Sequence, residues 1–327
     1  MSFPLNEDYL IDSQDYEETM RDLIFPYLSQ FRTDSMIHAH DGTPLFCSVF
    51  HADHPVGTVL LLHGFTENTY KYSEMIFSLL RNHFCVIAYD QRGHGRSGRD
   101  KDLSSNSVTH VDHFSDYVDD LSLICTSLLI SMPKPWNLFA HSMGGAVAAL
   151  YIEKYPDTFS AVSLCAPMIA PNTKVTPSFA AALFCYFPCI LGRGKHYPFF
   201  MKPYSGPEDF VSSCATDPVR FAWYDKEKAA HPEFQNSIPT YRWTLESIHV
   251  TKKILASGAP EKITCPVLLS MAEHDFSVMP EEQKIFIKRV PDGKLIFVKD
   301  ARHEIYRSMN HVLFPWWHEN LSFFCRK

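Results

Sequence analysis

Short apolar runs recur along the chain and are separated by stretches with helical spacing. Four of the runs precede residue 170, and each is almost continuously apolar, as a parallel strand buried on both faces requires. They cover residues 58–62, 84–89, 136–140 and 161–166. Two further runs, 266–271 and 294–298, follow after residue 250. We therefore predict a mostly parallel sheet.

The stretches between the first runs repeat apolar residues every three or four positions, as amphipathic helices do. The two clearest stripes are Met75, Ile76, Leu79 and Leu80, and Phe114, Tyr117, Val118, Leu121 and Ile124. Alternation of strands and helices predicts a doubly wound α/β fold.

The N-terminal part of the chain departs from this alternation. Residues 6–31 are acidic and have helical spacing, so we expect residues 1–34 to form an acidic helical leader. Residues 35–40 and 45–50 then flank Asp41-Gly42, a turn pair typical of a β-hairpin.

Residues 170–250 lose the alternation and are rich in proline and aromatic residues. A stretch too long for a loop, inserted within a sheet protein, is usually functional. We expect a helical cap, or lid, inserted after the sixth strand of a core made of residues 35–169 and 251–327. The alternative is an insertion that only stabilises the core. The cap residues that we expect to contact substrate are Phe179, Phe184, Trp223, Tyr241, Trp243, Arg193 and Arg242.

Ser142 is the candidate nucleophile. It lies in residues 140–145 (AHSMGG), which follow a predicted buried strand and open a predicted helix. This context matches the nucleophile elbow, with Ala140 in place of the usual first glycine. Such a turn lifts the hydroxyl clear of the sheet at a helix N-terminus, where N–H groups face developing negative charge. The alternative is a serine that only caps a helix.

A serine hydroxyl needs a base, and the base needs an orienting acid. In this type of fold the chain order is serine, acid, histidine. Asp275 and His303 fit this order, because each lies just beyond the carboxyl end of a predicted strand, where such sheets place their sites. Glu273 and Asp300 are rival acids at the same edge.

Most of the 17 histidines must be structural. The pairs His38 with His40 and His51 with His54 are close enough in sequence to suggest a metal site. No cysteine or carboxylate cluster completes either pair, so we expect no metal.

Two backbone N–H groups are needed to hold an oxyanion. We expect them at Met143, directly after the nucleophile, and at Phe65, in the turn after the first central strand, where Gly64 keeps the turn close to the site. Residues 90–97 (DQRGHGRS) lack the lysine and the spacing of a phosphate-binding P-loop. We interpret them as a structural turn beneath the site.

Composition narrows the classes of function. The 327 residues are 46% hydrophobic, enough for a sizeable core, and the net charge of -7 argues against nucleic-acid binding. Nine cysteines, an odd number, indicate a reducing compartment rather than a disulfide framework. No export signal is visible, and Pro188 interrupts the longest uncharged stretch. We therefore expect a cytoplasmic protein without a membrane span.

Charge is unevenly distributed along the chain. Residues 1–23 contain seven acidic residues and one basic residue, whereas residues 158–207 contain no acidic residue. The basic residues of this second stretch are Lys174, Arg193, Lys195 and Lys202. A mildly basic, aromatic cap is a surface that an anionic membrane attracts, so docking on the inner face of the membrane is one interpretation. The other is a solvated cap whose aromatic residues only line an acyl pocket.

The chain resembles α/β hydrolases of the monoglyceride lipase and lysophospholipase group, with closest similarity to the bacterial inner-membrane lysophospholipase. Its similar stretches are His63-Gly64, 90–97, 116–121 (DYVDDL), 140–146, 166–168 (APM), 239–243 (PTYRW), 246–248 (ESI) and 303–305 (HEI). The resemblance implies hydrolysis of the single acyl ester of a lysophospholipid, without a cofactor.

We therefore expect a serine hydrolase that releases a fatty acid and a glycerophospho-alcohol through an acyl-enzyme, its partner being a lipid with one acyl chain. A monoacylglycerol lipase or a broad carboxylesterase is an alternative, and a peptidase is hard to exclude because esters and amides share a tetrahedral intermediate. Serine at position 142 excludes the related enzymes of the same fold that use an aspartate nucleophile. A non-catalytic scaffold is expected to lack a member of the triad, and none is missing.

Overall fold

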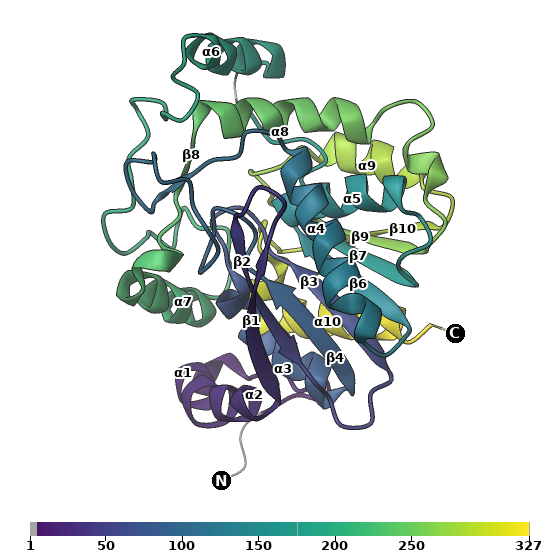
Figure 1. The fold of residues 1–327 in the computed structure, drawn as a ribbon. Coiled ribbons are helices and arrows are strands. Elements are labelled where there is room, and N and C mark those ends of the chain that lie inside the picture. The colour runs from purple at the N-terminus through teal and green to yellow at the C-terminus, as the bar shows by residue number, and fades with distance from the viewer. Residues whose placement is uncertain (1–4, 175, 327) are drawn as a thin grey trace.

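A sheet of eight strands forms the centre of the molecule (Figure 1). The computed structural model describes residues 5–174 and 176–326. In spatial order the strands are β1 (Arg32–His38), β2 (Pro44–Phe50), β4 (Phe84–Tyr89), β3 (Gly57–Leu62), β6 (Trp136–His141), β7 (Ala161–Cys165), β9 (Val267–Ala272) and β10 (Gly293–Val298). The β1–β2 and β2–β4 pairs are antiparallel and all other neighbours are parallel. This confirms the predicted mostly parallel sheet, and the hairpin begins slightly earlier than expected, at Arg32.

Helices cover both faces of the sheet, because the central strands are apolar on both sides. In β3, Leu60 and Leu62 pack in one core with α4 (Ser115–Ser127), α5 (Met143–Lys154) and α9 (Pro280–Arg289). Val59 and Leu61, which point the other way, pack in a second core with α3 (Ser73–Arg81) and α10 (Asn310–Phe324). The doubly wound α/β architecture is therefore confirmed.

The N-terminal leader packs into the second core. It contains α1 (Tyr16–Thr19), a π-helical turn (Met20–Ile24) and α2 (Phe25–Phe31). Leu10, Ile11, Met20 and Ile24 are completely buried beside α3 and α10. Most acidic side chains of the leader are exposed or half-buried, whereas Asp8 is buried and lies 3.1 Å from Nδ1 of His318 on α10.

The insertion between β7 and β9 contains α6 (Ser178–Ile190), α7 (Pro218–Ala230) and α8 (Tyr241–Ile254). A two-residue strand, β8 (Ile238–Pro239), pairs with β5 (Val108–Thr109) of the core. In Figure 1, α6 lies at the top of the view above α8, whereas α7 lies beside the leader. The buried Arg220 of α7 attaches the helix there, because it pairs with Glu74 of α3 and donates to the backbone carbonyl of Ile11 in the leader at 2.7 Å. The insertion thus has one part over the sheet and another attached to the leader.

Candidate active site

Ser142 lies on the sharp turn between β6 and α5. Its backbone has φ of 50° and ψ of -115°, a strained conformation for a residue with a side chain. The turn passes so close to the first central strand that a Cβ atom at Gly144 would lie 2.6 Å from the carbonyl oxygen of His63. Ala140 ends up fully buried inside the sheet. Small residues are therefore required here by close backbone approach, as the elbow pattern predicts.

His303 lies between Ser142 and Asp275. Its Nε2 atom is 2.7 Å from the Ser142 hydroxyl oxygen, and its Nδ1 atom is 2.7 Å from a carboxylate oxygen of Asp275. All three side chains are buried, and they come from the ends of β6, β9 and β10, three strands in one half of the sheet. The structure thus brings together residues that are up to 161 positions apart in sequence.

The rival acids have other partners. A carboxylate oxygen of Glu273 accepts a hydrogen bond from the backbone N–H of Asp300 at 2.8 Å, and both residues are exposed or half-buried rather than enclosed with the histidine. Asp275 is the carboxylate that meets the His303 ring.

The surroundings shift the pKa values of Asp275 and His303 in opposite directions. Burial alone would raise the pKa of Asp275, but the His303 ring and the N–H groups of Ser277 and Val278 outweigh it and lower the pKa below its ordinary value. Burial likewise opposes a charged His303, yet the neighbouring Asp275 carboxylate raises the His303 pKa above its ordinary value. Asp275 is therefore ionised, and His303 binds a proton more readily than a free imidazole.

Glu67, which the sequence pattern did not single out, lies at the centre of the buried network around the site. One of its carboxylate oxygens accepts hydrogen bonds from the Gly64 N–H (2.6 Å) and the Tyr72 hydroxyl (2.6 Å). The same oxygen lies 3.0 Å from Nδ1 of His141, whose Nε2 is 3.2 Å from the carbonyl oxygen of His303. Glu67 therefore connects the turn after β3 to the loop that carries the histidine.

The other carboxylate oxygen of Glu67 extends this network. It lies 2.9 Å from Nζ of Lys71 and accepts a hydrogen bond from the Tyr306 hydroxyl. Lys71 also pairs with Glu304 at 2.6 Å, the residue directly after His303. Burial raises the pKa of Glu67, but Lys71 and His141 lower it well below its ordinary value. The only local sequence signal was an acidic residue three positions after Gly64, and nothing in the pattern showed that it is buried.

The two expected oxyanion donors lie next to Ser142. Met143 is the first residue of α5, so its N–H has no acceptor within the helix. Phe65 follows Gly64, where an added Cβ would lie 3.0 Å from Cβ of Ser142. The Phe65 ring packs on Trp243 of α8, with ring centres 4.2 Å apart. The backbone of both donors therefore borders the nucleophile.

Residues 90–97 support that turn from below. The Asp90 carboxylate accepts hydrogen bonds from the backbone N–H and the hydroxyl of Thr69, both at 2.7 Å. The N–H of Gln91 donates to Nε2 of His63 at 2.8 Å. These contacts place the segment as a structural turn beneath the site.

An apolar groove of about 610 Å³ lies where α6 and α8 meet the start of α9. Phe179, Leu183 and Tyr186 of α6 line one side, and Leu245 and Ile248 of α8 line the other. The groove also reaches Ala170, in the segment whose Met168 N–H donates to the Ser142 carbonyl at 2.8 Å. Its lining contains neither Ser142 nor His303, so the segment of Met168 and Ala170 is the link between the groove and the nucleophile.

The other expected cap residues are scattered. Phe184 packs on Tyr241 at 5.7 Å and Arg193 is exposed, while the backbone of Arg242 bonds to Gly194. Of the seven expected residues, only Phe179 lines the groove. Trp223 lies on α7, where its ring stacks with those of Phe25 (ring centres 6.0 Å apart) and Tyr70 (5.6 Å). It joins α7 to the leader.

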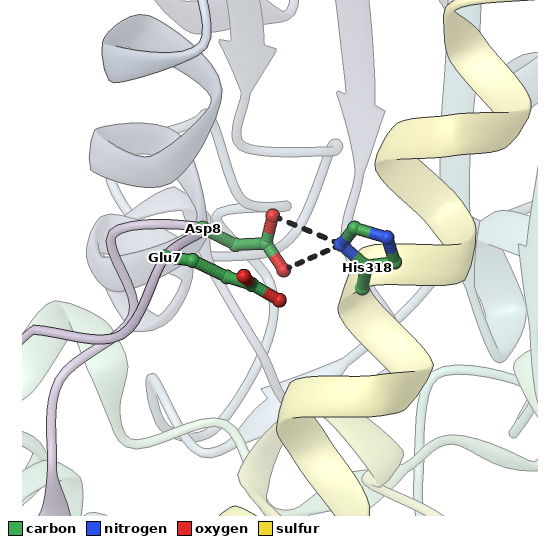
Figure 2. Close-up of side chains that lie close together, drawn as sticks. All are labelled: Glu7, Asp8 and His318. Carbon is green, nitrogen blue, oxygen red and sulfur yellow. Dashed lines mark hydrogen bonds and ion pairs between the residues drawn. The ribbon is translucent and has the colours of Figure 1, made fainter.

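Two clusters of potential metal ligands occur in the described residues. Figure 2 shows the first, in which Nδ1 of His318 on α10 lies 3.1 and 3.2 Å from the two carboxylate oxygens of Asp8, with Glu7 beside them. The second contains Glu273, His274 and Asp300. Both are largely exposed, and neither contains the histidine pairs at 38 and 40 or at 51 and 54.

Across residues 5–174 and 176–326, every helix is too short or too polar to cross a membrane. The apolar helix α6 has only 13 residues.

Comparison with known proteins agrees with this geometry. Residues 53–309 match the profile of the Hydrolase_4 family, described as serine aminopeptidase, S33. Lysophospholipase L2 of Escherichia coli K12 is 32% identical over 282 residues, covering 81% of this chain and 79% of that protein. A monoacylglycerol lipase of Mycolicibacterium smegmatis is 28% identical, covering 80% and 82%.

Solved structures share the architecture. The monoacylglycerol lipase of Paleococcus ferrophilus superposes with a TM-score of 0.65 and 23% identity, covering 86% of this chain and 98% of that chain. A soluble variant of the monoglyceride lipase of Saccharomyces cerevisiae, in complex with a substrate analogue, gives 0.68 and 18%, covering 92% and 98%. With the profile match extending over most of the sheet and the cap, this chain belongs to the Hydrolase_4 family of α/β hydrolases and is a serine hydrolase.

Proposed function

We propose that this enzyme hydrolyses the ester of a single-chain lipid, with a lysophospholipid as the preferred substrate. The observation that carries the proposal is the hydrogen-bonded series Ser142–His303–Asp275, with 2.7 Å at each contact. The apolar groove between α6 and α8 supports an acyl substrate. The relatives named lysophospholipase and monoacylglycerol lipase support the same substrate class.

In the proposed mechanism, His303 accepts the hydroxyl proton of Ser142 as the serine attacks the acyl carbonyl. Asp275 keeps the proton on Nδ1, so that Nε2 is the basic atom. The N–H groups of Phe65 and Met143 hold the oxyanion, each contributing about 3 kcal/mol of transition-state stabilisation. His303 then protonates the leaving glycerol oxygen, and water releases the fatty acid from Ser142 in a second addition.

The groove gives the acyl chain a place to lie, with its carboxyl end toward Ser142. Its lining is mainly apolar and aromatic, which favours chain burial over recognition of a peptide. A monoacylglycerol has the same chain and differs only in its alcohol, so monoacylglycerol lipase activity is the second candidate.

A lipid surface is the proposed docking partner of α6. Phe179, Leu183, Phe187 and Ile190 of this helix are each more than half exposed, and Phe199 in the loop that follows is 88% exposed. Exposed apolar patches of this kind mark interaction sites. Lys195 pairs with Asp100 and Asp102 at 2.7 Å each, which leaves less positive charge on the cap than the sequence indicated. Apolar insertion is therefore expected to dominate over attraction to anionic lipid.

Vesicle co-sedimentation tests this docking. The double variant Leu183→Ser with Phe187→Ser should lose binding to mixed phosphatidylethanolamine and phosphatidylglycerol vesicles. The matched control is Ile130→Ser, which changes an apolar side chain that is 66% exposed on another element. Equal loss in both proteins, or no loss in the double variant, argues against docking through α6.

Activity is tested by labelling and by a substrate panel. A fluorophosphonate probe should label the wild-type protein at Ser142 and leave Ser142→Ala unlabelled. Lysophosphatidylethanolamine, monoacylglycerol, p-nitrophenyl esters and aminoacyl p-nitroanilides are then compared at equal concentration. Faster cleavage of the anilides than of every ester would overturn the lipid assignment in favour of a peptidase.

A further inference from the structure

Two completely buried histidines lie beneath Phe65, the expected oxyanion donor in the turn after β3. His63 directly follows β3, and His94 belongs to the turn of residues 90–97. Their ring centres are 5.2 Å apart, and the His94 ring is 5.8 Å from the ring of Phe65. The hydrogen bonds of the deeper ring, His63, therefore bear on how the Phe65 backbone is held.

His63 has one hydrogen-bond partner at each ring nitrogen. The backbone N–H of Gln91 donates to Nε2 at 2.8 Å, and Nδ1 lies 2.7 Å from the carbonyl oxygen of Gly64. A ring nitrogen that accepts from an N–H carries no proton, whereas a carbonyl oxygen needs a donor opposite it. The two partners together fix the neutral tautomer of His63 with its proton on Nδ1, and this proton is donated to Gly64.

The surroundings also keep the His63 ring neutral. Burial lowers the pKa of His63, and the nearby His141 ring adds to this effect. The carboxylates of Asp90 and Glu67 act in the opposite direction, but they do not overcome burial. A second proton, on Nε2, would face the N–H of Gln91. The Nδ1–H donor is therefore retained at neutral pH.

The Gly64 carbonyl and the Phe65 N–H belong to the same peptide unit. A trans peptide unit is planar, and its C=O and N–H point in opposite directions. Holding the carbonyl toward His63 therefore fixes the direction of the Phe65 N–H, which no group in residues 5–174 or 176–326 accepts. The Gly64 N–H is held as well, by Glu67 at 2.6 Å. Both polar groups of Gly64 are thus engaged, and the Phe65 N–H is left as a donor beside the nucleophile.

The turn needs this support because its backbone is strained. Thr66, directly after Phe65, has φ of 62°, an unusual value for a β-branched residue. Such a conformation persists only where the surrounding contacts determine it. The bond from His63 to the Gly64 carbonyl is one of these contacts, and it lies on the peptide unit that carries the donor.

We propose that His63 is a positioning residue of the oxyanion hole, whose Nδ1–H holds the Gly64 carbonyl so that the Phe65 N–H points at the substrate oxygen that becomes negative. The backbone N–H of Gln91 acts one step earlier, because it fixes the tautomer that makes this donation. The inference rests on the proposed function, in which the Phe65 N–H binds the oxyanion.

The tautomer is tested first, in the wild-type protein. Histidine labelled with ¹⁵N is observed by NMR, and the His63 ring is identified by its contact with the Gln91 N–H. We expect a protonated Nδ1 and an unprotonated Nε2 at pH 7. A proton on Nε2, or an imidazolium, overturns the inference.

Two substitutions then separate the two ring nitrogens. In His63→Asn the side-chain amide nitrogen takes the place of Nδ1 and still donates to the Gly64 carbonyl. In His63→Gln the amide lies one bond farther out, at the place of Nε2, and serves only the Gln91 N–H. We expect kcat for p-nitrophenyl butyrate to fall about 10- to 100-fold in His63→Gln with little change in KM, and to stay within about fivefold of the wild type in His63→Asn.

A trifluoromethyl ketone inhibitor reports on the oxyanion hole itself, because its adduct with Ser142 carries the negative oxygen. Its inhibition constant should rise in His63→Gln by about the same factor as kcat/KM falls, and should change little in His63→Asn. The matched control is His110→Gln, which alters another buried histidine, one whose Nδ1 lies 2.9 Å from the Thr240 hydroxyl. The control should lose stability in urea without a change in the inhibition constant.

Each outcome has a distinct meaning. Equal kcat losses in His63→Asn and His63→Gln, or inhibitor affinity that does not follow kcat/KM, show that His63 only supports the fold and overturn the inference. Wild-type kcat in His63→Gln does the same. The NMR result decides the case in which His63→Gln does not fold. Absence of ester cleavage and of fluorophosphonate labelling in the folded wild type defeats the proposed function instead.

Discussion

Replacing Glu67 by glutamine removes one charge from the most connected buried group near the active site. The side chains of Glu67 and Lys71 are 2% and 5% exposed, so neither charge is stabilised by solvent. Breaking a buried pair by removing one partner costs about 3–5 kcal/mol, because the other charge remains in a poorly solvated place. Lys71 keeps Glu304 at 2.6 Å, so we expect Glu67→Gln to lose about 3 kcal/mol, at the lower end of that range.

The substitution should also slow catalysis. The glutamine amide offers one acceptor oxygen where the carboxylate offers two, while Gly64, Tyr72, Tyr306, Lys71 and His141 still present their groups. The turn that carries Phe65 and the loop that carries His303 then lose their common support. We expect kcat to fall by about 10- to 100-fold with a smaller change in KM, since an effect on transition-state geometry appears in kcat.

Urea unfolding followed by tryptophan fluorescence measures the stability, and an unchanged m-value would show that the unfolded state is comparable. The control is Glu227→Gln. The Glu227 side chain also has a tyrosine partner, Tyr70 at 2.9 Å, but it is 23% exposed, so this variant should lose less than about 1 kcal/mol of unfolding free energy. Because the folded pKa of Glu67 is lowered, its contribution is complete above the ordinary carboxyl pKa and is lost as the pH falls. The difference in unfolding free energy between the wild type and Glu67→Gln should therefore shrink from pH 5 toward pH 3. A loss under 1 kcal/mol at pH 7, or a difference that does not change with pH, refutes the reasoning.

Three further predictions concern other groups. Ser142→Ala should retain the wild-type unfolding midpoint within a small margin and lose at least about 10³-fold in kcat for a p-nitrophenyl ester, and turnover near the wild-type rate would rule out this nucleophile. His303 acts as a base only when neutral, and its pKa is raised, so kcat/KM should fall on the acid side with a midpoint above about pH 6.5. A kcat/KM value that does not change between pH 5 and pH 8 would contradict this. Burial raises the pKa of Glu153 to about 8 despite the nearby Arg289, so this group favours folding only below its ordinary pKa and loses that contribution as the pH rises toward 8. Glu153→Gln should therefore stabilise the protein by about 1–3 kcal/mol at pH 8 and by almost nothing at pH 4, and destabilisation at pH 8 would oppose this.

The strands, the helices of the core and the candidate nucleophile were predictable from the sequence because their signals are local. A buried parallel strand needs a continuous apolar run, and the turn at Ser142 needs small residues where two backbones meet. Asp275 and His303 were predictable for a related reason. Parallel strands end at one edge of the sheet, so residues just after β9 and β10 approach each other in any doubly wound arrangement.

The tertiary structure decided the groups whose surroundings come from distant parts of the chain. Glu67 is bonded to Tyr306, 239 positions away, and is buried only because the turn of residues 69–72, β6 and the last loop close around it. Trp223 appeared suited to an acyl pocket, but Arg220 holds α7 against the leader through its hydrogen bond to the Ile11 carbonyl and its ion pair with Glu74, and the Trp223 ring packs there on Phe25. One cavity beside α7 likewise combines Lys71, Lys228 and Arg307 from three separate segments of the chain. Periodicity shows which face of an element is apolar, whereas the pairing of buried charges depends on how complete elements pack.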